Sequence, residues 1–214
     1  MGVKPSIFIL SEKEYEGVLN LPCIKINFLK KEIELSKYDA LIFSSKNGVL
    51  AINKLTKNWK DIPSYSIGSG TSQIITSLGG KVAYEAKNSY GDDFAKEIKK
   101  RLKEQKVLFL RAKIVTSNLN KILLKASVHL DELIVYETRC NDCKELKTPP
   151  SNSVIIFSSP STIECFFRCF SWNTSYKAVV IGSKTASFMP SDINFVCASK
   201  QSISSCIELS KKLL

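Results

Sequence analysis

Two pairs of similar segments recur in this chain in the same order. Residues 40–49 (ALIFSSKNGV) recur as residues 154–163 (VIIFSSPSTI), and residues 66–75 (SIGSGTSQII) recur as residues 180–189 (VIGSKTASFM). Phe43 and Phe157 are 114 positions apart, and so are Gly68 and Gly182. A chance match of one short motif would not preserve the distance to the next motif. The sequence therefore predicts a duplicated unit, and we expect the function to lie between its two copies.

Each repeated segment predicts a strand, a tight turn and the start of a helix. Short runs of Ile, Val and Phe are typical of strands buried on both faces of a parallel sheet. Ser45 and Ser159 follow such runs and can cap a helix, which is a structural alternative to a role in binding. The turns in residues 66–75 and 180–189 each contain a glycine, which permits a positive φ angle or a close approach of the backbone. Because backbone N–H groups at helix starts bind anions, the duplication predicts a set of anion-binding turns.

The charge of the chain favours a polyanionic partner. Its 214 residues contain 31 basic and 20 acidic side chains, which gives a net charge of +11. Such a surplus suits nucleic acid, an acidic membrane surface or a small polyanionic substrate. No zinc-finger, basic-zipper or RNA-recognition pattern is present, and no apolar run approaches the roughly 20 residues that span a bilayer. We therefore expect a small polyanion, with no nucleic acid and no membrane as partner.

The cysteines predict neither a metal site nor a cofactor. The chain has seven cysteines and one histidine, His129, and it carries no recognisable export signal. These features favour reduced thiols in a cytoplasmic protein. Cys140 and Cys143 form a CxxC pair, but there is no second such pair to complete a zinc site. Phosphate-loop and dinucleotide-binding fingerprints are also absent from the sequence, so we expect no cofactor.

Strand and helix patterns alternate along the chain, which predicts doubly wound parallel sheets with helices on both faces. The strand signatures VLFLRAK and ELIVYET in the middle of the chain have weaker counterparts, SIFILSEK and CIKINF, near the N-terminus. The second copy therefore looks circularly permuted. We expect one continuous domain over residues 36–147 and one discontinuous domain made of residues 1–35 and 148–214. Two crossings between the domains predict a hinge with a cleft.

The repeated motifs, together with IVYET at residues 134–138, resemble those of the uroporphyrinogen-III synthase family. The resemblance covers nearly the whole chain. It implies two flavodoxin-like α/β domains, one of them discontinuous, joined by two linkers. It also implies a polyanionic substrate, the linear tetrapyrrole hydroxymethylbilane, in porphyrin and haem biosynthesis.

The family resemblance implies a lyase reaction that needs no metal, cofactor or covalent nucleophile. The bilane loses its terminal hydroxyl from ring A, and ring D attacks through its substituted carbon to give a spiro intermediate. Fragmentation and recombination then invert ring D before the macrocycle closes. Without enzyme the bilane closes to the uninverted isomer. The catalytic task is therefore mainly to hold the two ends of the substrate in position.

The resemblance assigns a catalytic role to Tyr136, which would assist departure of the hydroxyl. The alternative is a buried aromatic residue with a structural role. Residues of the repeated turns are expected to bind substrate: Ser44, Ser45, Gly68, Ser69, Thr71, Ser158, Ser159, Gly182 and Thr185. Arg111, Lys46 and Lys184 join this set because of their charge and their places at strand or helix ends.

Two other functions remain open at the level of sequence. A non-catalytic two-domain hinge protein could bind an acidic small ligand, and a nucleic-acid-binding protein could use the basic surface. Binding to nucleic acid would weaken steeply as the salt concentration rises. For the synthase we expect a cytoplasmic monomer that receives its bilane by transient handover from the upstream bilane-forming enzyme.

Overall fold

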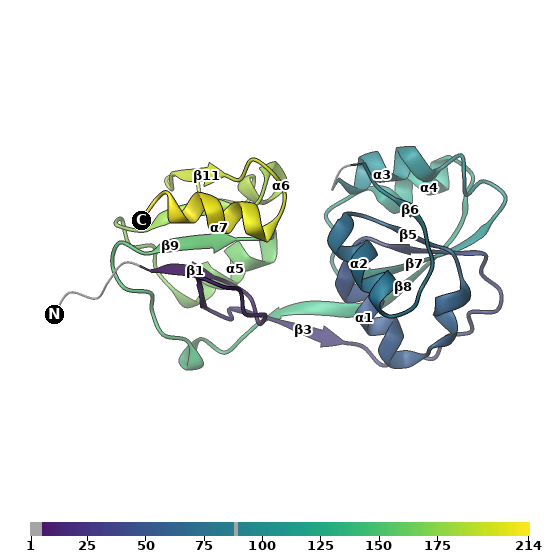
Figure 1. Ribbon diagram of the computed structural model, residues 1–214, viewed down its shortest axis with the longest axis horizontal. Helices are drawn as coiled ribbons and strands as arrows, with labels where there is room; N and C mark the ends of the chain where they lie inside the picture. The colour runs from purple at the N-terminus through teal and green to yellow at the C-terminus, as the bar shows by residue number, and fades with distance from the viewer. Residues whose placement is uncertain (1–5, 88–89) are drawn as a thin grey trace. The chain divides into compact units, whose positions relative to one another are not determined.

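The computed structural model describes residues 6–87 and 90–214, which divide into two compact units (Figure 1). The continuous unit is Ile26–Thr138, and the discontinuous unit joins the residues up to Lys25 with Arg139–Leu214. The chain therefore passes between the units at residues 25–26 and again at residues 138–139. The domain boundaries expected from the sequence, at residues 35–36 and 147–148, stay a prediction.

The continuous unit contains a six-stranded sheet of order β3-β8-β7-β4-β5-β6. Its strands are β3 (Ile24–Phe28), β4 (Ala40–Phe43), β5 (Ser64–Ser66), β6 (Val82–Glu85), β7 (Lys106–Ala112) and β8 (His129–Cys140). Its helices are α1 (Lys46–Leu55), η1 (Asn58–Asp61), α2 (Ser69–Ser77), α3 (Gly91–Ile98) and α4 (Leu119–Lys125). The pairs β4–β5, β4–β7, β5–β6 and β7–β8 are parallel.

The discontinuous unit contains a five-stranded parallel sheet of order β11-β10-β9-β1-β2. Its strands are β1 (Ile7–Ile9), β2 (Leu19–Asn20), β9 (Val154–Phe157), β10 (Lys177–Val180) and β11 (Phe195–Cys197). Its helices are η2 (Cys143–Glu145), α5 (Pro160–Cys169), α6 (Ser183–Ala186) and α7 (Ile203–Lys211). Figure 1 shows the purple β1 beside the green β9, so the two ends of the sequence share one sheet. Counted along the chain, this order is the flavodoxin-like 2-1-3-4-5.

Each sheet is covered by helices on both faces, which confirms the predicted doubly wound fold. Residues Ala40–Phe43 of β4 are all 0% exposed. Leu41 and Phe43 pack in the cluster that contains residues of α1 and α2, whereas Ile42 packs in the cluster that contains residues of α3 and α4. Successive side chains of a strand point to opposite faces, so a strand buried on both faces must be apolar throughout. The counterpart β9 is buried in the same way.

The topology confirms the predicted duplication and corrects one of its equivalences. β1 pairs with β9 as β7 pairs with β4, so SIFILSEK is the counterpart of VLFLRAK. The predicted counterpart of ELIVYET, residues 23–28, is wrong. β3 lies beside β8 in the sheet of the continuous unit, and β2 takes the equivalent place beside β1. β2 has only two residues, which is too short to give a sequence signal.

The expectation of reduced thiols is wrong for four of the seven cysteines. Cys140 forms a disulfide with Cys165, and Cys143 forms one with Cys169. The physical reason lies in tertiary packing. Cys140 is the last residue of β8 and Cys143 follows it, and α5 brings two cysteines one turn apart beside them. The CxxC pair is therefore part of two disulfides that span 25 and 26 residues of sequence.

Trp59 provides a test of the packing in the continuous unit. Its ring is 0% exposed and lies edge-on to Phe43, with the ring centroids 6.0 Å apart. A Cβ atom on Gly80 would lie 2.4 Å from Cζ3 of Trp59. We expect Gly80→Ala to lower the free energy of unfolding by about 1–3 kcal/mol, because the rigid indole must shift. Urea denaturation of the full chain measures this loss.

Gly70→Ala is the matched control, since a Cβ atom there meets nothing within 4 Å. Gly70 lies in the first turn of α2, where alanine is the better helix former. Its free energy of unfolding should be unchanged or slightly higher. Equal losses for the two variants would contradict the packing described around Trp59.

Candidate active site at the carboxyl edges of the two sheets

The predicted serines lie where β4 leaves its sheet. Ser45 has an extended backbone and caps α1, and its hydroxyl oxygen accepts a hydrogen bond from the backbone N–H of Asn47 at 3.2 Å. Ser44 and Lys46 flank it and are half-buried. The capping function of Ser45 is therefore present, and its hydroxyl also contacts Tyr136, as described below. A cap at the end of a buried strand directs the first N–H groups of the helix outward.

The second turn of the continuous unit follows β5. Gly68 has φ 75°, a left-handed conformation that side chains rarely adopt, so glycine is required there. The backbone N–H of Ile67 donates to the carbonyl of Phe43 at 3.1 Å, and that of Thr71 donates to the carbonyl of Gly68 at 3.0 Å. Thr71 is buried, whereas Ser69 is exposed at the start of α2. Of these two side chains, Ser69 is the accessible one.

Tyr136 lies near the end of β8 and is 6% exposed. Its hydroxyl is hydrogen-bonded to the side chain of Ser45. Burial raises the pKa of the phenol above its ordinary value of 10.0, and the hydrogen bond with Ser45 lowers it to a smaller extent. The phenol is therefore protonated at neutral pH and is a proton donor. The structure thus brings together two residues that are 91 positions apart in the sequence.

Arg111 lies near the end of β7, where its side chain is held by other parts of the protein. Its Nε atom forms an ion pair with Glu132, and its Nη1 atom donates to the carbonyl of Ala112 at 2.8 Å. The side chain of Arg111 is 18% exposed. These contacts favour a role in anchoring the end of β7 over direct contact with substrate.

A second cation at the same edge was missed by the sequence analysis. Lys113 follows β7, and its Nζ atom lies 3.4 Å from a carboxylate oxygen of Glu137. The other oxygen of Glu137 accepts a hydrogen bond from Asn27 at 3.2 Å. The backbone N–H of Lys113 donates to the carbonyl of Tyr136 at 2.9 Å, so this lysine adjoins the candidate catalytic residue. The sequence signal that could have identified Lys113 is its position directly after the strand VLFLRA.

In the discontinuous unit, Ser158 and Ser159 follow β9 as Ser44 and Ser45 follow β4. Ser159 has an extended backbone and caps α5, in which Pro160 is the first residue. Its backbone N–H donates to the hydroxyl of Thr162 at 3.2 Å, and that hydroxyl donates to the carbonyl of Ser159 at 2.6 Å. Both serines are half-buried. The first strand-to-helix turn of the continuous unit is therefore repeated, with a proline-initiated helix.

The second turn of this unit repeats the backbone contacts of its counterpart. The N–H of Ile181 donates to the carbonyl of Phe157 at 3.0 Å, and that of Thr185 donates to the carbonyl of Gly182 at 3.0 Å. Thr185 is buried and Lys184 is exposed. A Cβ atom on Gly182 would lie 2.6 Å from Nε2 of Gln201, so a larger residue there would require the flexible side chain of Gln201 to shift. Because α6 has only four residues, its dipole is weak.

The carboxyl ends of β4 and β7 meet at the point where the strand order of the sheet changes direction. Ligands of open α/β sheets bind in the crevice outside the strands at such a point. In the continuous unit the structure therefore places Ser44, Ser45, Lys113 and Tyr136 at the expected ligand edge. The equivalent point of the discontinuous unit is the end of β9 and β1, where Ser158 and Ser159 lie.

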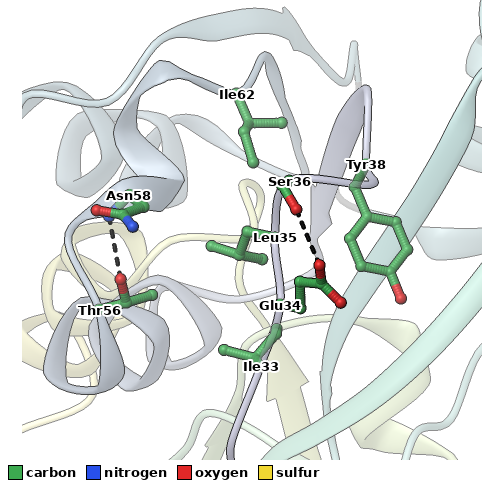
Figure 2. A pocket seen from close by; sticks show the side chains of 8 residues that line it. All are labelled: Ile33, Glu34, Leu35, Ser36, Tyr38, Thr56, Asn58 and Ile62. Atoms are coloured by element: carbon green, nitrogen blue, oxygen red, sulfur yellow. Dashed lines mark hydrogen bonds between the residues drawn. The ribbon is translucent and has the colours of Figure 1, made fainter.

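A cavity of about 500 Å³ lies at the opposite edge of the sheet in the continuous unit. Figure 2 shows Leu35 and Ile62 pointing toward its interior, with Glu34 and Tyr38 on one side. Its lining residues precede β4 and β5, so they lie at the amino ends of these strands. None of the predicted site residues lines this cavity.

In the part of the chain that the structure describes, no group of three or more His, Cys, Asp or Glu side chains is arranged to hold a metal ion. Within the same residues, no helix combines the length and apolar character needed to cross a membrane.

The pKa of Tyr136 can be tested by alkaline titration. Subtracting the tyrosinate absorbance of Tyr136→Phe from that of the native protein isolates this one phenol. We expect its ionisation above pH 10, because burial raises its pKa. Since the folded pKa exceeds the unfolded one, its contribution to stability should be intact below about pH 10 and lost as the pH rises further. Ionisation centred below pH 10 would contradict the buried environment of this side chain.

The chain is similar to known proteins both in sequence and in fold. The family model described as uroporphyrinogen-III synthase HemD matches residues 10–208. The uroporphyrinogen-III synthetase of Helicobacter pylori superposes with a TM-score of 0.84 and 27% identity, covering 99% of this chain and 100% of that one. A mutant uroporphyrinogen III synthase from Thermus thermophilus, 11% identical, superposes with a TM-score of 0.60 and covers 98% of each chain, which shows a shared fold. No curated protein sequence matches the chain.

The resemblance found in the sequence is thereby confirmed, because the matched residues include both copies of the repeat and the IVYET motif. The chain belongs to the uroporphyrinogen-III synthase family.

Proposed function

We propose that this protein is a uroporphyrinogen-III synthase, a lyase that cyclises hydroxymethylbilane with inversion of ring D. The observation that carries the proposal is the match to this family over residues 10–208, together with the buried Tyr136 at the ligand edge of the continuous unit. The phenol is a protonated donor where a substrate of this fold is expected to bind. The cytoplasmic location, the monomeric state and the handover of substrate from the bilane-forming enzyme remain predictions.

The substrate carboxylates would be bound by the turns of both units. Backbone N–H groups at the starts of α1, α2 and α5 favour negative charge. Lys46, Lys184 and Lys113 would add positive charge beside these turns, and Lys113 is well exposed, at 62% of its side chain. We assign Arg111 to a supporting role because its guanidinium is paired with Glu132. The net charge of +11 would attract the polyanionic bilane to both units.

Tyr136 would act as a general acid on the bilane. Its O–H donates a proton to the ring A hydroxyl. The carbon–oxygen bond then breaks, a water molecule departs, and an electrophilic methylene-pyrrolenine remains. Attack by the substituted carbon of ring D forms the spiro intermediate, which fragments and recombines in the inverted orientation. The final ring regains its aromatic state by losing a proton, which restores the phenol. Ser45 would orient the phenol through their shared hydrogen bond.

An isomer assay tests the function directly. The purified chain is supplied with hydroxymethylbilane in a buffer that contains a metal chelator, and the products are oxidised and separated as porphyrin isomers. We expect the inverted isomer to predominate over the uninverted isomer that forms in buffer alone. A hinge protein that only binds an acidic ligand would protect the bilane without forming the inverted isomer. Formation of the uninverted isomer alone would disprove the synthase proposal.

The same assay tests the role of Tyr136. Tyr136→Phe removes one oxygen and keeps the buried ring, so the fold should be retained. A positioned general acid typically contributes about 10²–10⁴-fold, and the bilane also ionises unaided, so we expect inverted-isomer formation to slow by roughly tenfold or more. More of the uninverted isomer should then form.

Tyr38→Phe is the matched control for this variant. Its hydroxyl donates to Asp131 at 2.8 Å and the residue lines the cavity at the opposite edge of the same sheet. Its isomer ratio should equal that of the native protein. A folded and fully active Tyr136→Phe variant would assign Tyr136 a structural role and leave catalysis to positioning of the substrate alone.

A further inference from the structure

Two disulfides connect the end of β8 to α5 within the discontinuous unit. Cys140 is the last residue of β8 and Cys143 begins η2, while Cys165 and Cys169 lie one turn apart on α5. The bonds join Cys140 to Cys165 and Cys143 to Cys169, with Cα–Cα distances of 5.1 and 5.0 Å. They cross-link α5 to the segment at the end of β8 at two successive positions.

The segment held by these bonds lies immediately after the second passage between the units. η2 is stabilised by local contacts, in which the N–H of Lys144 donates to the side chain of Asp142 and that of Leu146 donates to the carbonyl of Cys143. Other contacts also attach the segment: the N–H of Asn141 donates to the carbonyl of Cys23, its side-chain amide donates to the carbonyl of Pro22 at 2.6 Å, and Leu146 packs at the margin of an apolar core. The disulfides are therefore its covalent attachment to α5.

The two bonds differ in their accessibility to a reductant. Cys143 and Cys169 are both half-buried, so each end of their disulfide is partly open to solvent. In the other disulfide, Cys140 is also half-buried, but Cys165 is only 2% exposed and packs in the apolar core beside Phe166, so only one end of this bond is partly open to solvent. Thiol–disulfide exchange requires that a thiolate reach one of the sulfur atoms. The Cys143–Cys169 bond should therefore be reduced before the Cys140–Cys165 bond.

We propose that these four cysteines form a reversible redox modification site that fastens and releases the segment after β8. A dithiol reductant attacks a sulfur of Cys143 or Cys169, forms a mixed disulfide and leaves as a disulfide, transferring two electrons and two protons. The inner bond is reduced in a second, slower step of the same stoichiometry. Hydrogen peroxide restores each bond by accepting two electrons from two thiols and releasing two molecules of water.

The four cysteines are distinct from the residues assigned to the proposed synthase site, although β8 also carries Tyr136 and Ser159 caps α5. A reversible redox site also accounts for disulfides in a protein predicted to be cytoplasmic, since the paired cysteines of reducing compartments are usually those that cycle. The other described cysteines, Cys23, Cys197 and Cys206, are free thiols and provide an internal reference.

The test uses the full chain in mixtures of reduced and oxidised dithiothreitol, followed by acid quenching, alkylation in denaturant, which exposes the buried thiols of Cys23 and Cys206, and peptide mass mapping. We expect three alkylated cysteines in the oxidised protein and all seven in the reduced protein. Cys143 and Cys169 should become labelled before Cys140 and Cys165. Hydrogen-exchange rates of residues 141–146 should rise roughly tenfold or more on reduction, and the melting temperature should fall by roughly 5–15 °C.

Variants separate the two bonds. Replacing both Cys143 and Cys169 by serine should reproduce the faster exchange of residues 141–146 without reductant, whereas Cys197→Ser should change neither exchange nor melting. Seven free thiols under oxidising conditions would overturn the proposal. So would disulfides that resist the reductant in the folded protein, or one zinc ion per chain bound by the reduced cysteines. None of these readouts requires the bilane, so failure of the proposed function would not affect them.

Discussion

Burial of β4 and β9 on both faces is the constraint on which each unit depends. The four side chains of each strand are 0% exposed, and burying an aliphatic or aromatic side chain contributes about 1.5–3 kcal/mol. Both strands are also paired on both edges, so their backbone groups are satisfied within the sheet. The chain can expose polar groups only beyond the carboxyl end of each strand. The serine pairs occupy that place because the helix that follows must be capped there.

Much of the fold was predictable because its signals are local. The apolar runs, the capping serines and the repeated spacing predicted the central strands, the helices that follow them and the duplication. β2 and β6 were missed because one has two residues and the other alternates half-buried and exposed side chains. The place of β3 beside β8 depends on pairing between segments about 110 residues apart, for which the sequence carries no local signal.

As with the fold, most residues of the candidate site were predictable from local sequence patterns, but their contacts with neighbouring strands were not. The positions of Ser45 and Ser159 followed from the strand-to-helix pattern, whereas the pairing of Arg111 with Glu132 and of Lys113 with Glu137 depends on neighbouring strands. The two ion pairs also differ physically. Arg111 is half-buried and bound to two main-chain carbonyls, so its charge is committed to the protein. Lys113 is exposed although its partner Glu137 is buried, so in the proposed function a substrate carboxylate would compete for its ammonium group.

The environment of Tyr136 limits how much of the catalysis this residue can supply. Burial raises its pKa, which keeps the phenol protonated but also makes it a weaker acid. Efficient general acids have pKa values near the working pH, so a phenol in this setting contributes near the low end of the usual range. In the proposed mechanism, most of the preference for the inverted product would then come from holding the two ends of the bilane. In the proposed mechanism, duplicated turns with backbone donors would provide this restraint, because their positions are determined by the buried strands that precede them.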